Sequence, residues 1–200
     1  MGLRAQNRQR TREALVGAAL ELFRERGYAN VTIGEIAAHA GVARRTVFRY
    51  FATKEDLVLF DHADYVATFR RVLSGRDRRE PPLEALRRAA LEVAAELQQN
   101  RAQLLPRLRL MMKEPAVTAR YVELDQRWHE AILEALAPDA PSPAPSPATE
   151  LRLRLFAGAA VGALNAGLGV WVKGGGRLDL EAAVKTVFQL LERGLGNVRV

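Results

Sequence analysis

The sequence predicts an all-α protein of about nine helices. Apolar residues recur at spacings of three and four along most of the 200 residues, as one face of a helix requires. Glycines, prolines and Ser/Thr caps interrupt that spacing and mark where one predicted helix ends and the next begins. No segment alternates like a strand, and no repeat of fixed period is present. A hydrophobic content of 48% with 26% charged residues is typical of a chain that buries a core.

The first two helices are short and have defined ends. From Arg8 to Arg26 the apolar positions keep helical spacing, and Gly27 follows as a C-terminal stop. Thr32 stands three residues before Glu35, the spacing of a capping box, and the helix that begins there ends at Gly41.

The chain then resumes helix near residue 44. A second cap, Thr53 with Asp56, predicts a long fourth helix that continues to Leu73. Gly75 and the pair Pro81–Pro82 end it, and Pro82 suits the first turn of a helix that reaches about Asn100.

Proline punctuates the remaining helices, which we expect near 101–113, from about 116 to 137, and at about 149–173 and 179–196. The segment 138–149 holds five of the nine prolines and predicts a Pro-rich flexible linker. We expect residues 1–52 to form one domain and residues 53–200, with that linker inside, to form the other.

Charge is unevenly distributed. The whole chain carries +7 with a pI near 10.3, and residues 1–55 alone hold ten basic and five acidic residues. This excess favours an anionic partner near the N-terminal end over a charge that serves solubility alone. The chain has no cysteine, and its polar, Arg-rich start does not match a signal peptide, so we expect a cytoplasmic protein.

The stretch GVARRTVFRYF at 41–51 is the predicted binding site for that partner. At 100° per residue, Val47, Phe48 and Phe51 fall on one side of a helix. Polar and cationic side chains that can donate to base edges and phosphates fall on the opposite side: Arg45, Thr46, Arg49 and Tyr50. A short helix, a glycine turn and such a second helix form the helix-turn-helix pattern that binds the major groove of DNA.

The segment TIGEIAAHAGVARRTVFRYFATKEDLV at 32–58, behind a basic N-terminal helix, resembles the TetR family of bacterial transcriptional regulators. The likeness is strong over about residues 8–60 and only architectural beyond. It implies an N-terminal helix-turn-helix DNA-binding domain and a C-terminal helical domain for ligand binding and dimerisation. Base contacts are implied for Arg44, Arg45, Thr46 and Phe48, and phosphate contacts for Thr32, Tyr50 and Lys54.

Two positions depart from the family pattern. Phe48 replaces a tyrosine, which removes a hydroxyl, and Gly34 offers no side chain where many members have one that reaches a base. We therefore expect sequence readout to depend on Arg44, Arg45 and Arg49.

The resemblance also implies a small-molecule pocket in the C-terminal domain. Its bulky, adaptable lining would suit a hydrophobic effector, although for each member taken alone ordinary core packing is the more common role. The predicted lining is Leu105, Leu108, Arg109, Met111, Met112, Tyr121, Leu124, Trp128, Phe156 and Asn165. A diffuse likeness to acyl-thioester-binding regulators covers RYVELDQRWHEAILEAL.

A single helix-turn-helix needs a homodimer for specific binding to a palindromic operator. The resemblance implies that the last two helices form the interface of that dimer. The small residues of the first and an apolar stripe on the second form the predicted surface: Gly158, Gly162, Val184, Val187, Phe188, Leu191 and Leu195. The uncharged run from Leu155 to Val172 also reaches the length of a membrane span, but half of it is glycine and alanine, and we expect no membrane partner.

Enzyme signatures are incomplete. The segment HEAIL at 129–133 has Leu133 where a zinc-protease motif needs its second histidine, and the serines stand in predicted loops. We expect no catalytic residues, metal or cofactor. A ligand-responsive repressor is the favoured interpretation, with a DNA-binding protein that has no inducer as the alternative.

Overall fold

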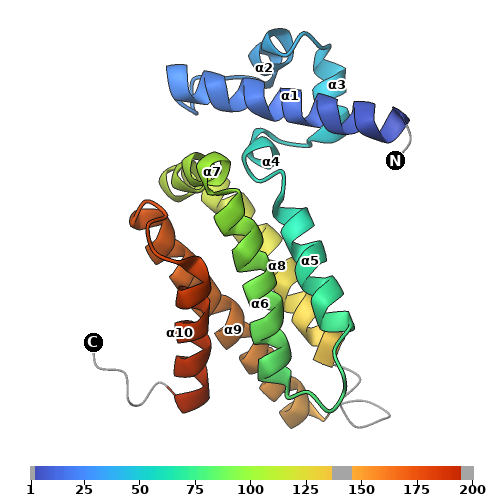
Figure 1. Ribbon diagram of the computed structural model, residues 1–200. Coiled ribbons are helices and arrows are strands. Elements are labelled where there is room, and N and C mark those ends of the chain that lie inside the picture. The colour runs from blue at the N-terminus through green and yellow to red at the C-terminus, as the bar shows by residue number, and fades with distance from the viewer. Residues whose placement is uncertain (1–2, 137–145, 195–200) are drawn as a thin grey trace. The chain divides into compact units, whose positions relative to one another are not determined.

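The computed structural model describes residues 3–136 and 146–194. Within those ranges the chain forms ten α-helices and no strand, which confirms the all-α prediction (Figure 1). The helices divide between two compact units, one of residues 1–60 with 110–122 and one of residues 61–109 with 123–200. The predicted functional domains, residues 1–52 and residues 53–200, stay a prediction.

The first unit is built from α1 (Leu3–Arg26), α2 (Ile33–His39), α3 (Arg44–Tyr50) and α4 (Lys54–Val58). Helix α1 packs on α2 and α4, and α2 packs on α3. Large aliphatic side chains from each helix fill the centre of this unit: Leu15, Leu22, Ile36, Val47 and Leu57. The end of α7 and the start of α8, residues 110–122, belong to the same unit.

The second unit contains α5 (His62–Ser74), α6 (Pro82–Gln99), α9 (Pro147–Lys173) and α10 (Leu180–Arg193), with most of α7 (Arg101–Lys113) and α8 (Pro115–Leu136). Helix α6 packs against both α5 and α10, and α10 packs against α9. Trp171 of α9 is fully buried, and its indole N–H donates to Oε1 of Gln98 on α6 at 3.1 Å.

The predicted long fourth helix is wrong, because the structure ends α4 at Val58 and starts α5 at His62. Leu57, Val58 and Leu59 are all buried, yet consecutive residues on one helix point about 100° apart. The break allows all three to face inward, and it accounts for the tenth helix among the described residues.

Most of the predicted linker, residues 138–145, lies outside the described residues. Its predicted end at residue 149 is wrong. Helix α9 already begins at Pro147, where the hydroxyl of Ser146 accepts from the Thr149 N–H at 3.2 Å. Serine at the cap and proline in the first turn are the usual start of a helix.

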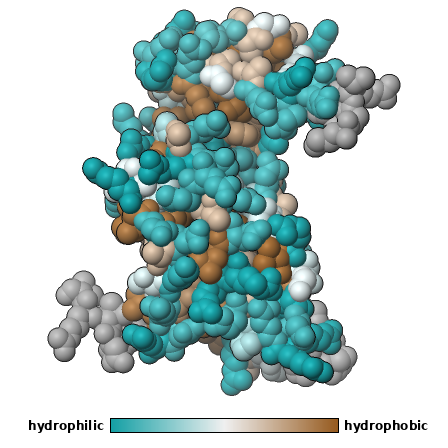
Figure 2. Space-filling view, in the orientation of Figure 1, coloured by the Kyte–Doolittle hydropathy of each residue, from teal (hydrophilic) through white to brown (hydrophobic). Residues whose placement is uncertain are grey.

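Helix α9 meets the length and composition of a membrane span within the described ranges, with 28% of its apolar window buried. One such helix is weak evidence for a membrane protein. On the visible face of the molecule, hydrophobic residues show only as separate patches among hydrophilic ones (Figure 2).

Candidate nucleic-acid interface and effector region

Helix α3 presents three arginines from an anchored backbone. Val47 and Phe51 are buried, with exposed fractions of 0% and 4%, and hold the helix against its unit. Arg44, Arg45 and Arg49 are exposed. A helix fixed on one side and cationic on the other is what reading a DNA groove requires.

Phe48 is the exception to the predicted apolar side. It is 47% exposed, and the Arg44 guanidinium lies 5.5 Å from the centre of its ring. Phe48 projects about 80° around the helix from the Val47–Phe51 side, too far to be buried with it. The expectation that it packs inward is therefore corrected, whereas its implied base contact stays a proposal.

The turn before α3 is fixed by backbone geometry. Gly41 adopts φ 67°, and the Val42 N–H donates to the Ala37 carbonyl at 2.9 Å while the Gly41 N–H donates to that of Ala38 at 3.1 Å. These two bonds form a Schellman motif, whose left-handed position favours glycine. The angle between α2 and α3 is set here.

Thr32 and Glu35 form the predicted capping box at the start of α2. The Glu35 carboxylate accepts from the Thr32 N–H and hydroxyl, both at 2.8 Å, and from Arg26 at 3.0 Å. The bonds from the Thr32 backbone and hydroxyl, with the Arg26 charge, lower the pKa of Glu35 despite some desolvation. A phosphate contact through the Thr32 hydroxyl would share that group with Glu35. Gly34 follows on the same turn with room for a side chain.

Lys54 has a structural role that the sequence did not reveal. Its ammonium donates to the carbonyls of Tyr28 and Val31 at 2.8 and 3.0 Å and lies 4.1 Å from the centre of the Tyr28 ring. The Tyr28 hydroxyl donates to Glu55, and burial followed by this bond raises the pKa of Tyr28. Lys54 thus holds the connection between α1 and α2.

Helices α1 and α3 bring a second set of donors together around Tyr50. The Arg49 guanidinium lies 5.2 Å from the centre of the Tyr50 ring. Burial raises the pKa of Tyr50, but bonds with Arg49 and Thr11 and the charges of Arg49 and Arg8 outweigh it, so the pKa is lowered. Two positive charges and two hydroxyls in one place suit a DNA phosphate.

The start of α8 is tied to α4 within the first unit. Nε of Arg120 donates to Oδ1 of Asp56 at 2.8 Å, and Oδ2 of the same carboxylate accepts from the Thr53 N–H at 3.1 Å. Asp56 therefore closes the capping box of α4 and also binds α8.

The predicted effector pocket is divided between the units and remains a prediction as a whole. Met111, Met112 and Tyr121 belong to the first unit. Met111 is buried, whereas Met112 is 42% exposed. The other predicted members belong to the second unit: Leu105, Leu108, Arg109, Leu124, Trp128, Phe156 and Asn165.

Two of these second-unit residues have polar partners there. The Asn165 side chain donates to both carboxylate oxygens of Asp125 at 3.3 and 3.2 Å. Burial raises the pKa of Asp125. The Trp128 indole N–H donates to Nε2 of His62 at 3.0 Å, and its ring meets Phe69 edge-on with centroids 5.0 Å apart.

The buried titratable residues of the second unit were not predicted from the sequence. Arg107 is only 3% exposed and pairs with Asp61, which also accepts from the Tyr65 hydroxyl at 3.2 Å. Burial, and then the charge of Arg127, lowers the pKa of His62 to about 4. A helical wheel could have found Arg107, since it lies on the side of Leu104 and Met111.

No three His, Cys, Asp or Glu side chains come together as a metal site in the described part of the chain.

Part of the predicted dimer surface on α10 is buried within its own chain, and the surface as a whole stays a prediction. Val184 and Phe188 are buried, at 6% and 0%, on a helix that packs against α6 and α9 of its own chain. Val187 and Leu191 are half-buried, and Leu195 lies outside the described residues. On α9, Gly158 is half-buried and Gly162 is exposed.

A different apolar surface is exposed on α9. Leu151, Leu155 and Val170 are 58%, 62% and 61% exposed, and the exposed residues between them on the same side include Ala159, Gly162 and Ala166. At 100° per residue these positions fall within about 100° of one another. Together they are called here the α9 stripe, and the exposed Arg152 and Lys173 lie on the same side of the helix.

Comparisons with known proteins agree with this architecture. Residues 15–59 match the family model of bacterial regulatory proteins of the tetR family, and residues 80–196 match the MftR C-terminal domain. The chain is 30% identical over 130 residues to the mycofactocin biosynthesis transcriptional regulator MftR of Mycobacterium tuberculosis, covering 65% of this chain and 66% of that protein. It is also 30% identical over 142 residues to the regulator TcmR of Streptomyces glaucescens, covering 68% and 63% of the two chains.

The fold is similar to that of a solved repressor. FadR of Thermus thermophilus, a TetR family transcriptional repressor in complex with lauroyl-CoA, matches with a TM-score of 0.58 and 26% identity over 94% of this chain and 96% of that one. With both family models matched and the helix-turn-helix in place, the chain belongs to the TetR family of bacterial transcriptional regulators.

Proposed function

We propose that the protein is a repressor that binds a palindromic DNA operator as a homodimer and is released by a small, largely apolar ligand. The observation that carries this proposal is α3, where exposed Arg44, Arg45 and Arg49 stand on a helix anchored by Val47 and Phe51. Acting on DNA, the protein would work in the cytoplasm. No catalytic role is proposed.

Base readout is assigned to the exposed side of α3. Arg45 and Arg49 can each donate two parallel hydrogen bonds to a guanine, and Thr46 offers a hydroxyl and a methyl group. The Arg44 guanidinium lies against the Phe48 ring, and the family resemblance supports a base contact for both residues. Gly34 would let the DNA approach α2 closely.

Phosphate contacts are assigned to both sides of the helix-turn-helix. Tyr50 with its Arg49 and Thr11 partners would bind one phosphate. Thr32 and Lys54 would bind others through donors that already stabilise the fold. Such contacts orient the protein without reading sequence.

The α9 stripe is the proposed dimer surface. Its exposed leucines and valine would lose water on association, and the small residues Ala159, Gly162 and Ala166 would allow a second helix to approach closely. A two-fold axis through this stripe would pair two copies of one surface.

A ligand-responsive mechanism is supported by two observations. Helices α7 and α8 are continuous, and each contributes residues to both units, so a change in the second unit can reach Arg120 through α8 and, through its ion pair, Asp56. The Thermus thermophilus relative binds lauroyl-CoA, whose acyl chain is apolar. One observation supports the alternative, a regulator without an inducer. Asn165 and Trp128 already donate hydrogen bonds to Asp125 and His62 within the protein.

The test of DNA readout starts from an operator selected from random duplex DNA with the full chain. Arg45→Ala or Arg49→Ala should weaken operator binding by roughly 1–3 kcal/mol and relax base preference at one position per half-site. Arg193→Ala, an exposed arginine on α10, is the matched control. Equal losses for all three variants, independent of sequence, would remove the assignment of α3 as the reading helix.

The test of ligand response uses lauroyl-CoA and a neutral apolar probe. A hundredfold release from the operator needs a ligand that binds the DNA-incompetent state more tightly by about 2.7 kcal/mol. Thermal stabilisation together with release supports the induced mechanism. Probes that bind without changing operator affinity support the alternative.

A further inference from the structure

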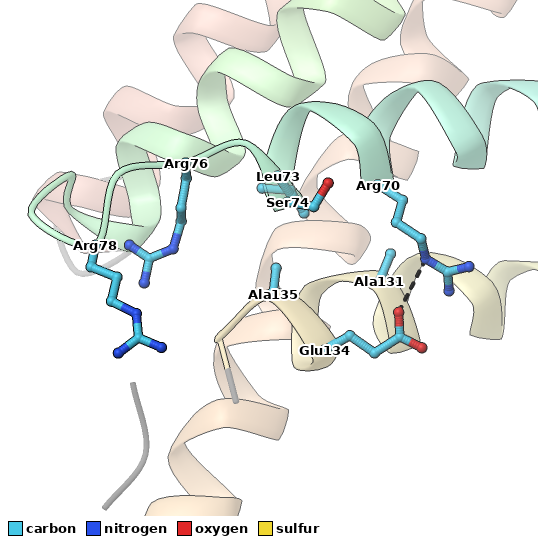
Figure 3. Close-up of a pocket in the computed structure, with 8 residues that line it drawn as sticks. All are labelled: Arg70, Leu73, Ser74, Arg76, Arg78, Ala131, Glu134 and Ala135. Atoms are coloured by element: carbon cyan, nitrogen blue, oxygen red, sulfur yellow. Dashed lines mark ion pairs between the residues drawn. The ribbon is translucent and has the colours of Figure 1, made fainter. Parts of the chain in front are cut away.

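The second unit contains a cationic pocket that the proposed function does not use. It has a volume of about 470 Å³ and lies between the end of α5, the connection to α6 and the end of α8 (Figure 3). Arg76 and Arg78 extend from the connection on one side, and Arg70 and Glu134 flank the other. The pocket is called here the Arg70–Arg78 pocket.

The floor of this pocket is apolar. Leu73 of α5 and Ala131 of α8 are buried, with Ala135 one turn beyond. These side chains leave a small hydrophobic surface beneath the charged rim. A ligand with one apolar group and one anionic group would match both parts.

The wall that carries the arginines is held in place before any ligand arrives. The Arg76 guanidinium donates to the Glu80 carbonyl at 2.8 Å, and the Glu80 carboxylate accepts from Arg88 at 2.9 and 3.2 Å. The Arg79 N–H donates to Oδ1 of Asp77 at 2.8 Å, which orders the turn between them. Pre-ordering of this kind reduces the entropy lost on binding.

The charges on the rim determine the ligand class. The lining contains three guanidiniums and one carboxylate, and Nε of Arg70 lies 3.1 Å from Oε2 of Glu134. The rim therefore has an excess of two positive charges, which a dianion neutralises and a monocarboxylate does not. Guanidinium groups also match the several oxygens of a phosphate.

We propose that the Arg70–Arg78 pocket binds a small organic phosphate, with the phosphate on the arginine rim and an apolar group on the floor of Leu73, Ala131 and Ala135. This inference goes beyond the proposed function, because it concerns a second site and assigns it no effect on DNA. The readout is binding itself.

The experiment titrates the full chain by calorimetry at low ionic strength with phenyl phosphate, inorganic phosphate and benzoate. Phenyl phosphate should bind with a stoichiometry of one per chain and at least severalfold more tightly than the other two. Arg78→Gln should weaken its binding about tenfold through loss of a charged donor. Glu134→Gln should strengthen its binding severalfold, since it removes the opposing charge.

Two controls place the binding at this pocket. Arg71→Gln changes an exposed arginine of α5 outside the lining, and Arg193→Gln changes an exposed arginine of α10; both should leave the affinity unchanged. The gain from Glu134→Gln cannot come from misfolding. No binding of phenyl phosphate at millimolar concentration, equal binding of inorganic phosphate, tighter binding of benzoate, or losses shared by the two controls would each overturn the proposal.

Discussion

The two units use polar side chains in opposite ways. In the first unit, polar groups hold the ends of short helices, as Thr32 and Thr53 do at their capping boxes and Lys54 does on two carbonyls. In the second unit, polar side chains meet each other between long helices, as Arg107 meets Asp61 and Trp128 meets His62.

Sequence distance separates the capping boxes of the first unit from the buried pairs of the second. Each capping box joins residues three apart, so its spacing can be read directly from the sequence. Arg107 and Asp61 are 46 residues apart, and Trp128 and His62 are 66 apart. Buried polar pairs are also costly to break, because the remaining partner stays away from water. The comparison therefore predicts that the largest losses of stability occur in the second unit.

Arg107→Met should produce the largest effect. Asp61, whose side chain is 19% exposed, would keep a charge beside an apolar replacement, so the free energy of unfolding should fall by about 3–5 kcal/mol. Urea denaturation measures it. The double variant Arg107→Met with Asp61→Leu should recover most of the loss.

The matched control for Arg107 is Arg70→Met, since Arg70 pairs with Glu134 at the surface. Its loss should stay below about 1 kcal/mol. If the Arg107 variant lost no more unfolding free energy than this control, the expectation that buried pairs of the second unit contribute most to stability would be wrong.

His62 should make stability depend on pH. Its pKa of about 4 in the folded protein is below the ordinary 6.5, so the stability it contributes is present above pH 6.5 and lost as the pH falls toward 4. The loss over this window is about 3 kcal/mol. Burial and Arg127 favour the neutral ring, while Asp61 opposes them.

Unfolding free energies of the wild type and of His62→Gln, measured between pH 7 and pH 4.5, test this expectation. The variant should lose most of the slope, since His39 is exposed and remains in both proteins. If the dependence of the unfolding free energy on pH were the same in both proteins, groups other than His62 would cause the loss of stability in acid.

Lys54→Met sharpens the comparison inside the first unit. Loss of two charged hydrogen bonds should reduce the free energy of unfolding by about 1.5–3 kcal/mol. Binding should weaken alike on all DNA sequences, with the salt slope lowered by about one. Lys113→Met, an exposed residue of the same unit, should change stability by no more than about 0.5 kcal/mol.

Thr53→Ala should have the smallest effect. The hydroxyl accepts from the Asp56 N–H at 3.3 Å, and loss of such a cap costs about 1 kcal/mol. Thr53→Ser keeps the hydroxyl and should retain most of the stability in a thermal melt. A loss above that of Lys54→Met would reverse the expected order within this unit.

The fold was largely predictable because its boundaries are local. Gly27 and Gly41 adopt φ 78° and 67°, and both capping boxes are present where the spacing placed them. The break after Val58 was not predictable, since Asp61 precedes α5 without capping it through a side-chain bond. Its carboxylate is instead bound by Arg107 and Tyr65.

The candidate site was predictable in its exposed arginines and less so around them. Helical angles alone placed Arg45 and Arg49 opposite the buried Val47. Phe48 lies near the border between the buried and exposed sides of α3, where its angle around the helix does not determine whether it is buried. The role of Lys54 depends on carbonyls 26 and 23 residues away, which no spacing rule reveals.

Residues 110–122 have a consequence for protein engineering. Although they lie far along the chain, they belong to the compact unit of the DNA-binding helices, where Val117 is fully buried and Arg120 binds Asp56. The DNA-binding unit is therefore not a module that a cut after Phe60 could excise or that a chimera could exchange as one piece. A swap of operator specificity between relatives would need to transplant this second segment as well, or confine itself to the exposed side of α3.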